Sequence, residues 1–356
     1  MATDENQGSG PVAERHRFDV RALESYLGER IDGFAGPLEV EQFRGGQSNP
    51  TFKLSTPSRR YVMRAKPGPA AKLLPSAHAV DREFRVQRAL AATEVPVARM
   101  HCLCEDETIT GRAFYVMDLV EGRVFWQQGL PDSTAAERAT IYDEMNRVIA
   151  ALHRVDHRAV GLEGFGRIGG YLERQISRWS KQYLASETEP IPEMNRLIDW
   201  LPAHIPPGDE TTIVHGDYRL DNMIFAPDEL KVVAVLDWEL STLGHPLVDF
   251  AYHAMSYHIP GEQFRGIAGL DHRALGIPTE REYIARYCER TGRTGIDHYG
   301  FYLAYNGFRL AAILQGIMKR AVDGTAASTE AVDAGRRAKP LARLAWALAE
   351  KAGARV

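Results

Sequence analysis

The feature that most constrains this chain is a polar loop between two short apolar segments, residues 213–237 (IVHGDYRLDNMIFAPDELKVVAVLD). Asp217 lies in the loop, Asn222 follows five residues later, and Asp237 comes directly after the apolar run VVAVL. Carboxylate and amide oxygens are the ligands that Mg²⁺ prefers, and a carboxylate can also accept a proton from a hydroxyl group. The pattern therefore predicts a site that combines Mg²⁺ binding with proton transfer.

The spacing within this loop resembles a known catalytic motif. Protein kinases carry H-R-D-x-x-x-x-N followed by a strand and a metal-binding Asp, and this chain keeps that spacing with glycine in place of arginine. The HGDxxxxN loop and the LDWE that follows look like those of the aminoglycoside phosphotransferase and choline-kinase group, small-molecule kinases with the protein-kinase fold. The stretches YVMRAKPG, LLPSAHAVDREFRV, RWSKQY and FRLAAILQGI resemble one branch, which occurs alone in bacteria and fused to acyl-CoA dehydrogenases in larger proteins.

The resemblance implies a role for each polar residue of the stretch. Asp217 would be the base that orients the acceptor hydroxyl and takes its proton. Asn222 and Asp237 would bind the Mg²⁺ that bridges the phosphates of ATP. His215 is expected to brace the loop backbone, and Asp249 matches an Asp that anchors this loop in the family.

The first 120 residues show the pattern of a nucleotide-binding sheet. The loop RGGQSN could lay backbone N–H groups against a triphosphate, although an ordinary hairpin turn is the alternative. Its candidate phosphate contacts are Gly45, Gly46, Ser48 and Asn49. Helices are expected at 20–33 and 80–92, and strands at 39–43, 51–55, 61–66, 101–105 and 113–120.

A basic residue on the third strand is expected to contact the α- and β-phosphates. Strand alternation puts Val62, Arg64 and Lys66 on one face. The resemblance of YVMR to the family pattern favours Arg64, with Lys66 as the alternative. A basic strand end that is only solvated and binds no phosphate is the other possibility. Glu83, on the following helix, is the candidate partner that would hold Arg64 under the nucleotide.

The fifth strand runs FYVMDLVEG into a glycine, the form of the hinge between lobes in this family. The resemblance makes Met117 the gatekeeper and assigns the backbone of Asp118 and Val120 to the adenine edge. A plain edge strand is the alternative, because any hinge backbone can bind adenine.

The remainder of the chain is predicted to be mostly helical. Thr134 and Glu137 form a capping box, and the helix after it is expected to bury apolar residues spaced i, i+4, i+7 and i+11. The whole pattern predicts an α+β, two-lobed, protein-kinase-like fold. It would comprise a disordered tail at 1–15, a five-stranded antiparallel sheet lobe at 16–120, and a helical lobe at 121–356 with the catalytic loop, metal site and acceptor pocket.

The composition of the chain limits the classes of molecule that it is expected to bind. A net charge of −4 gives no general attraction to nucleic acid or to acidic membranes, so neither is expected as a partner. Three cysteines without a second ligand pair indicate neither disulfides nor zinc, and no apolar leader precedes the first helix, so a cytoplasmic protein is expected. Residues 251–310 carry six acidic and seven basic side chains, whereas a pocket for a polycationic aminoglycoside should be distinctly acidic.

We therefore expect an ATP- and Mg²⁺-dependent phosphotransferase that acts on a hydroxyl group of a small molecule. The fused branch suggests a hydroxylated acyl or acyl-CoA acceptor, in preference to an aminoglycoside, and a functional link to an acyl-CoA dehydrogenase. Two alternatives remain: a non-catalytic nucleotide-binding module, and a Ser/Thr protein kinase. The second is disfavoured because only residues 238–246 separate Asp237 from the next element, too few for an activation loop.

Overall fold

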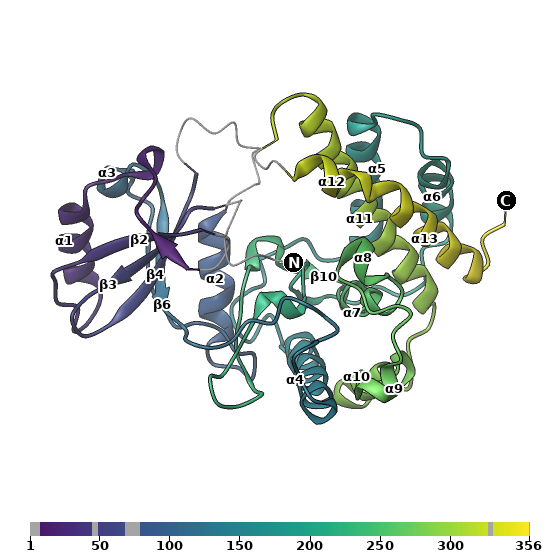
Figure 1. The fold of residues 1–356 in the computed structure, drawn as a ribbon, viewed down its shortest axis with the longest axis horizontal. Helices are drawn as coiled ribbons and strands as arrows, with labels where there is room; N and C mark the ends of the chain where they lie inside the picture. Colours follow the sequence, from purple (N-terminus) through teal and green to yellow (C-terminus); the bar gives the residue numbers. More distant parts are fainter. Residues whose placement is uncertain (1–7, 45–48, 68–78, 327–329, 356) are drawn as a thin grey trace. The chain divides into compact units, whose positions relative to one another are not determined.

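The computed structural model describes residues 8–44, 49–67, 79–326 and 330–355 of the chain (Figure 1). The chain forms two compact units. Unit 1 contains Met1–Val124, Val160–Leu162 and Met223–Ser241, and unit 2 contains Phe125–Ala159, Glu163–Asn222 and Thr242–Val356.

Unit 1 is built on one sheet whose neighbouring strands are all antiparallel, in the order β1-β2-β3-β4-β6-β5. In β3 the buried Phe52 and Leu54 alternate with less buried polar residues, whereas the buried run Tyr61–Met63 of β4 is typical of a strand covered on both faces. The bounds are β1 Ser9–Gly10, β2 Glu39–Phe43, β3 Thr51–Ser55, β4 Arg60–Ala65, β5 Met100–Cys104 and β6 Phe114–Asp118. Five of these strands match the predicted ones to within two residues at each end.

The sixth strand corrects the prediction of a five-stranded sheet and of a disordered tail over residues 1–15. Strand β1 lies inside that tail and pairs with β2, and the Ala13 N–H donates to Gln42 Oε1 at 3.0 Å. The backbone groups along the edge of β2 attract such a segment because an unpaired strand edge offers free donors and acceptors. Residues 1–7 lie outside the described part of the chain.

Helices α1 (Val20–Arg30) and α2 (Val80–Leu90) belong to two different clusters of the sheet core. The α1 cluster includes Phe52, Met63 and Phe114, and the α2 cluster includes Phe84 and Tyr115. Because side chains alternate between sheet faces, Arg64, which pairs with Tyr115 across β4 and β6, lies on the α2 side. Unit 1 also contains the short helices η2 Glu14–His16 and α3 Glu107–Thr110.

A hairpin that follows the catalytic loop packs with unit 1, although the sequence assigned it to the helical lobe. It consists of β8 (Met223–Phe225), β9 (Val232–Val235) and the short helix η4 (Trp238–Leu240). Main-chain hydrogen bonds explain this attachment: Arg123 and Phe225 exchange two at 2.8 and 2.9 Å, and the Val235 N–H donates to Pro96 O at 2.9 Å.

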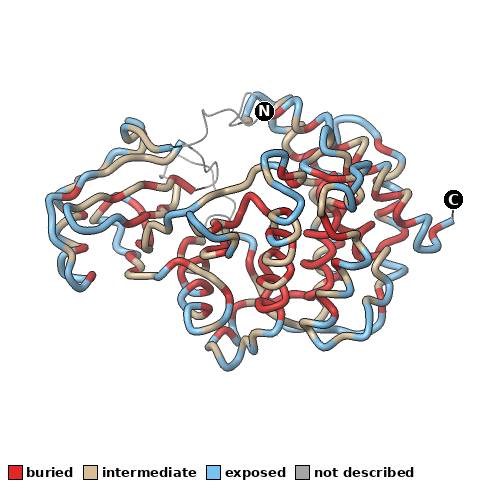
Figure 2. Tube along the Cα trace, turned by 60° about the horizontal axis from the view of Figure 1, so that its bottom comes forward, coloured by how far each residue is buried: buried red, intermediate tan, exposed pale blue. Residues whose placement is uncertain are grey.

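Unit 2 is mostly helical and has its core along α11, which packs against α5, α7, α12 and α13. The buried residues follow these central helices (Figure 2). Helix α4 begins at Thr134 with the predicted capping box to Glu137. The helices are α4 Ala135–Arg154, α5 Tyr171–Ser186, α6 Pro192–Ala203, η3 Leu220–Asn222, α7 Pro246–Ala254, η5 Met255–Tyr257, α8 Gly261–Phe264, α9 His272–Leu275, α10 Glu280–Thr291, α11 Tyr299–Val322, α12 Ala331–Arg336 and α13 Ala338–Lys351.

A two-stranded ladder, β7 (Thr212–Val214) with β10 (Thr242–Gly244), leads into the catalytic loop. Over the described residues, no helix combines the length and the apolar character needed to cross a membrane. The antiparallel sheet in one unit and the helices in the other agree with the predicted α+β class.

Candidate functional site

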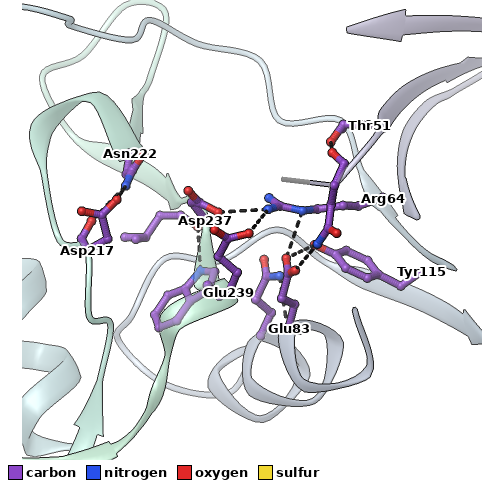
Figure 3. Close-up of polar contacts among 12 residues, drawn as sticks. Thr51, Arg64, Glu83, Tyr115, Asp217, Asn222, Asp237 and Glu239 are labelled. Atoms are coloured by element: carbon purple, nitrogen blue, oxygen red, sulfur yellow. Dashed lines mark hydrogen bonds and ion pairs between the residues drawn. The ribbon is translucent and has the colours of Figure 1, made fainter. Parts of the chain in front are cut away.

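Arg64 gathers three carboxylates within unit 1 (Figure 3). Its Nε atom lies 3.2 Å from Glu83 Oε2, and its Nη2 atom lies 3.0 Å from Asp237 Oδ1 and 3.2 Å from Glu239 Oε2. The carboxylates raise the pKa of Arg64 even though burial opposes them. We call Arg64, Glu83, Asp237 and Glu239 the Arg64 cluster. It contains the predicted pairing of Arg64 with Glu83, while the choice between Arg64 and Lys66 as the phosphate contact stays a prediction.

Glu83 is the most deeply buried carboxylate of the Arg64 cluster, with 1% of its surface exposed. Tyr115 Oη donates to Glu83 Oε2 at 3.0 Å, and Asn49 Nδ2 donates to Oε1 at 2.9 Å. Burial raises the pKa of Glu83 to about 7, against the opposing effect of Arg64. The side chain of Asn49, a predicted phosphate contact, is thus engaged with Glu83. Its predicted companions in the glycine loop lie outside the described residues: Gly45, Gly46 and Ser48.

Asp237 adopts a conformation that is uncommon for a residue with a side chain. Its φ and ψ angles are 63° and 58°, in the left-handed region. Such a conformation costs free energy and is concentrated at functional sites. The indole Nε1 of Trp238 donates to Val235 O at 2.9 Å, which fixes the turn after β9. The Asp237 side chain is 34% exposed, so the carboxylate stays accessible although Oδ1 pairs with Arg64.

The Asp217 carboxylate in unit 2 is held by three neighbours, of which Figure 3 shows Asn222. The Tyr252 hydroxyl donates to Oδ1 at 2.6 Å, Arg219 Nη2 lies 3.0 Å from Oδ2, and Asn222 Nδ2 donates to Oδ2 at 3.2 Å. Asn222 Nδ2 also donates to the carbonyl oxygen of Asp217 at 2.9 Å. With its amide nitrogen used in this way, Asn222 has its carbonyl oxygen as the group suited to a cation.

The backbone of the catalytic loop is pinned from α7. The carboxylate of Asp249 accepts hydrogen bonds from the N–H groups of His215 and Gly216, each at 2.8 Å. His153 Nε2, from α4, lies 3.2 Å from Asp249 Oδ2, and His215 Nδ1 accepts from the Asp217 N–H at 3.2 Å. These partners lower the pKa of Asp249 although burial opposes them. Asp249 and His215 therefore have the loop contacts that the sequence predicts.

Three residues of this region were not identified as parts of the site from the sequence: Arg219, Tyr252 and Arg309. Arg309, buried in α11, donates from Nη2 to Gly216 O at 2.7 Å. Its guanidinium carbon lies 5.0 Å from the ring centre of Tyr252 and 5.7 Å from that of Trp179. A polar residue that interrupts an otherwise apolar helix was the available signal for Arg309. We call Asp217, Arg219, Asn222, Tyr252 and Arg309 the Asp217 cluster.

At the predicted hinge, Met117 pairs with Val62 in β4. The Asp118 N–H donates to Arg99 O at 2.9 Å, and Asp118 Oδ1 lies 2.7 Å from His101 Nε2. Val120 follows the end of β6 and is half-buried. The roles predicted for Met117, Asp118 and Val120 toward adenine remain predictions.

The oxygen donors fit Mg²⁺ in their chemistry. Over the described ranges, no group of three or more His, Cys, Asp or Glu side chains could hold a metal ion by itself. Mg²⁺ is commonly bound through one or two carboxylates together with substrate phosphates and water. Asp237 in unit 1 and Asn222 in unit 2 supply suitable oxygens, and their joint role as magnesium ligands stays a prediction.

Comparisons with known proteins identify the family of the chain. The profile of the phosphotransferase enzyme family matches residues 39–286. Mouse acyl-CoA dehydrogenase family member 10 is 46% identical over 349 residues, which cover 97% of this chain and 32% of that protein. This chain thus spans about a third of the length of that relative, and less than half of the length of the family member 11 proteins that it also matches.

Solved structures show the same fold. A candidate aminoglycoside phosphotransferase from Ralstonia eutropha is 61% identical, with a TM-score of 0.87 over 94% of this chain and 99% of that one. Aminoglycoside phosphotransferase APH(4)-Ia, solved with ADP and hygromycin B, is 16% identical, with a TM-score of 0.61 over 94% of this chain and 100% of that one. The second likeness shows the kinase-like fold alone. The chain belongs to the phosphotransferase enzyme family, in the branch related to the acyl-CoA dehydrogenase family members.

Proposed function

We propose that the protein transfers the γ-phosphoryl group of ATP to a hydroxyl group of a small molecule, with Mg²⁺ as the cofactor. The observation that carries this proposal is the hydrogen bonding of Asn222 to Asp217 within a loop whose backbone is pinned by Asp249. This contact orients a carboxylate for a hydroxyl group and leaves an amide oxygen for a cation. An ordinary surface loop has no need of either arrangement.

Asp217 is the proposed base. The acceptor oxygen forms a bond to the γ-phosphorus as the bond from phosphorus to the bridging oxygen of ADP breaks, and the hydroxyl proton passes to Asp217. Tyr252 and Arg219 hold the carboxylate in place through the contacts at 2.6 and 3.0 Å. Because the transition state is loose, much of the effect of Asp217 comes from positioning the hydroxyl group.

The charge balance of the Arg64 cluster supports nucleotide and metal binding. Three carboxylates face one guanidinium group, so the cluster has an excess of negative charge whenever all three are ionised. Mg²⁺, when bound, would offset that excess and the charge of the phosphates. Asp237 and Asn222 are the proposed ligands, and Arg64, held by Glu83, is the proposed contact to the α- and β-phosphates.

ATP as the donor is supported by the ADP complex of APH(4)-Ia, which shares the fold. In this chain, the hydrogen bond from the Asp118 N–H to Arg99 O occupies one backbone group of the hinge. We therefore propose that Asp118 contacts adenine through its carbonyl oxygen and Val120 through its N–H group, beside Met117. Gly45, Gly46, Ser48 and the backbone of Asn49 are proposed as the phosphate loop.

The acceptor is proposed to be a hydroxylated acyl or acyl-CoA compound. The 46% identity to mouse acyl-CoA dehydrogenase family member 10 supports this class and a functional link to an acyl-CoA dehydrogenase. An aminoglycoside is disfavoured, because the buried cation beside the catalytic loop is the chain's own Arg309. A polycationic acceptor there would face a like charge.

Mass spectrometry of products from a mixed acceptor panel tests the proposal. The purified chain would receive MgATP with hydroxyacyl-CoAs, sugars, amino alcohols, choline and aminoglycosides, with casein added to test protein-kinase activity. A phosphorylated small molecule that disappears with Asp217→Asn is the expected result. If MgATP binds and no acceptor or casein is phosphorylated, while ATP hydrolysis is absent as well, the chain is a non-catalytic module. Phosphorylated casein alone would instead make it a protein kinase.

A further inference from the structure

A small cavity lies beside the proposed base within unit 2. Its volume is about 30 Å³, enough for one small group. Tyr252 and Arg219 line it, and both also contact the Asp217 carboxylate, at 2.6 and 3.0 Å. The cavity is therefore next to the atoms that would receive the proton of an acceptor.

Both charged side chains that line the cavity are cationic, and each also contacts a carboxylate outside the lining, Arg219 that of Asp217 and Arg265 that of Asp221. The lining contains two guanidinium groups, those of Arg219 and Arg265, and no carboxylate among the described residues. His253, which also lines it, is kept neutral because burial lowers its pKa to about 4. The pKa of Arg265 is lowered to about 10 by burial and by the charge of Arg219, so two cations still face the cavity at neutral pH.

A third polar group in the wall has no partner among the described residues. The Oε1 atom of Gln128 is buried without a hydrogen bond, and the residue is 6% exposed. A buried acceptor atom without a donor is costly, so it indicates that a ligand or water supplies one. Gln128 lines this cavity, so the missing donor would enter there.

The Arg265 side chain is 42% exposed, and its backbone lies in a closely packed turn. Arg265 follows α8 with a φ of 45°, and the next residue, Gly266, runs so close to Ile259 that a Cβ there would collide with the carbonyl oxygen. Asp221 pairs with the Arg265 guanidinium and is itself 8% exposed. An arginine that uses part of its guanidinium on Asp221 keeps further N–H groups that suit an anionic oxygen group.

We propose that this cavity is the acceptor subsite and binds an anionic oxygen group, a carboxylate or a phosphate, carried by the hydroxylated acceptor. Arg219 and Arg265 donate to the anionic oxygens, and an O–H or N–H group of the acceptor donates to Gln128 Oε1. The inference rests on the proposed function and adds to it that the protein selects acceptors by charge. The apolar side chains of Met255, Ile259 and Phe264 complete the wall.

Four three-carbon probes that differ in the group opposite the hydroxyl test this selection: 3-hydroxypropanoate, 3-hydroxypropyl phosphate, 1,3-propanediol and 3-amino-1-propanol. Binding to the full chain is measured by ligand-detected NMR titration, and phosphorylation is measured separately by mass spectrometry. We expect at least tenfold tighter binding of an anionic probe than of the diol or the amine. The first two probes distinguish a carboxylate subsite from a phosphate subsite.

Variants make the test specific. Arg265→Gln should remove the preference for the anion, and Gln128→Glu should reverse it toward the amine. Arg281→Gln, an exposed arginine of α10, should leave it unchanged. Equal affinities for all probes, or a preference that survives Arg265→Gln in a variant with unaltered circular dichroism, would overturn the inference. A charge preference without any phosphorylated product would support the subsite and count against the proposed function alone.

Discussion

Replacing Glu83 with glutamine should change how the stability of the protein depends on pH. Glu83 is almost completely buried, and its pKa is about 7, against an ordinary value of 4.5. A carboxyl group with a raised pKa binds its proton more tightly in the folded state. Its contribution to stability is therefore fully present below the unfolded pKa and is lost as the pH rises through the folded pKa.

The size of this loss follows from the shift. A difference of about 2.5 pKa units corresponds to roughly 3 kcal/mol over the whole titration, of which about 2.5 kcal/mol falls between about pH 5 and about pH 8. Wild-type protein should lose this amount of unfolding free energy over that interval. In Glu83→Gln, the decrease in unfolding free energy over the same interval should be smaller than in wild type by about 2.5 kcal/mol. Glutamine does not titrate, and it can still accept a hydrogen bond from Asn49.

Urea unfolding of the two proteins at both pH values measures the difference directly. Glu29→Gln is a matched control, because Glu29 is an exposed glutamate on α1 of the same unit. Titration of histidines and of other carboxyl groups is common to all three proteins and cancels in the comparison. Equal pH dependence in wild type and Glu83→Gln would refute the raised pKa of the buried Glu83 carboxyl group beside Arg64.

Three other substitutions test the supports of the site. Asp249→Asn replaces a charged acceptor of two loop N–H groups, so urea unfolding should show a loss of about 1.5–3 kcal/mol, and steady-state kinetics should show a lower kcat. Arg309→Met removes the donor to Gly216 O, and kcat should fall about tenfold or more while the Kd for MgATP, from calorimetry, stays unchanged. Gly122→Ala would place a Cβ against the Phe225 carbonyl oxygen. The unfolding temperature should therefore fall, corresponding to a loss of about 1–3 kcal/mol of unfolding free energy. Unchanged values in these assays would contradict the corresponding contacts.

The strands and the catalytic loop could be predicted because their signals are local. Strands β2 and β3 have the predicted bounds, since alternation and the flanking turn residues mark both ends. The capping box of Thr134 and Glu137 predicted the start of α4, and the structure contains it. The motif spacing likewise singled out Asp217 and Asn222, and the structure joins them by a hydrogen bond at 3.2 Å.

The missed features depend on contacts between distant parts of the sequence. Strand β1 has two residues, too few for any periodicity, and forms only because the β2 edge is available. Tyr252 lies on a helix with apolar surroundings, where an aromatic residue is expected in the core, and Arg309 differs from the core pattern only as a charged residue in an apolar helix. Glu239 follows Asp237 by two residues, and nothing in the local pattern indicates that it shares Arg64 with Glu83 and Asp237.

Phosphorus-31 NMR of the chain with MgATP and an acceptor from the panel tests the central claim most directly. We predict a new phosphate-ester signal whose rate of appearance falls by about 10²-fold or more in Asp217→Asn. Asp228→Asn, at an exposed aspartate of the hairpin after the loop, should keep the wild-type rate. Ester formation at equal rates in wild type and Asp217→Asn would contradict the assignment of Asp217 as the base and, with it, the proposed mechanism.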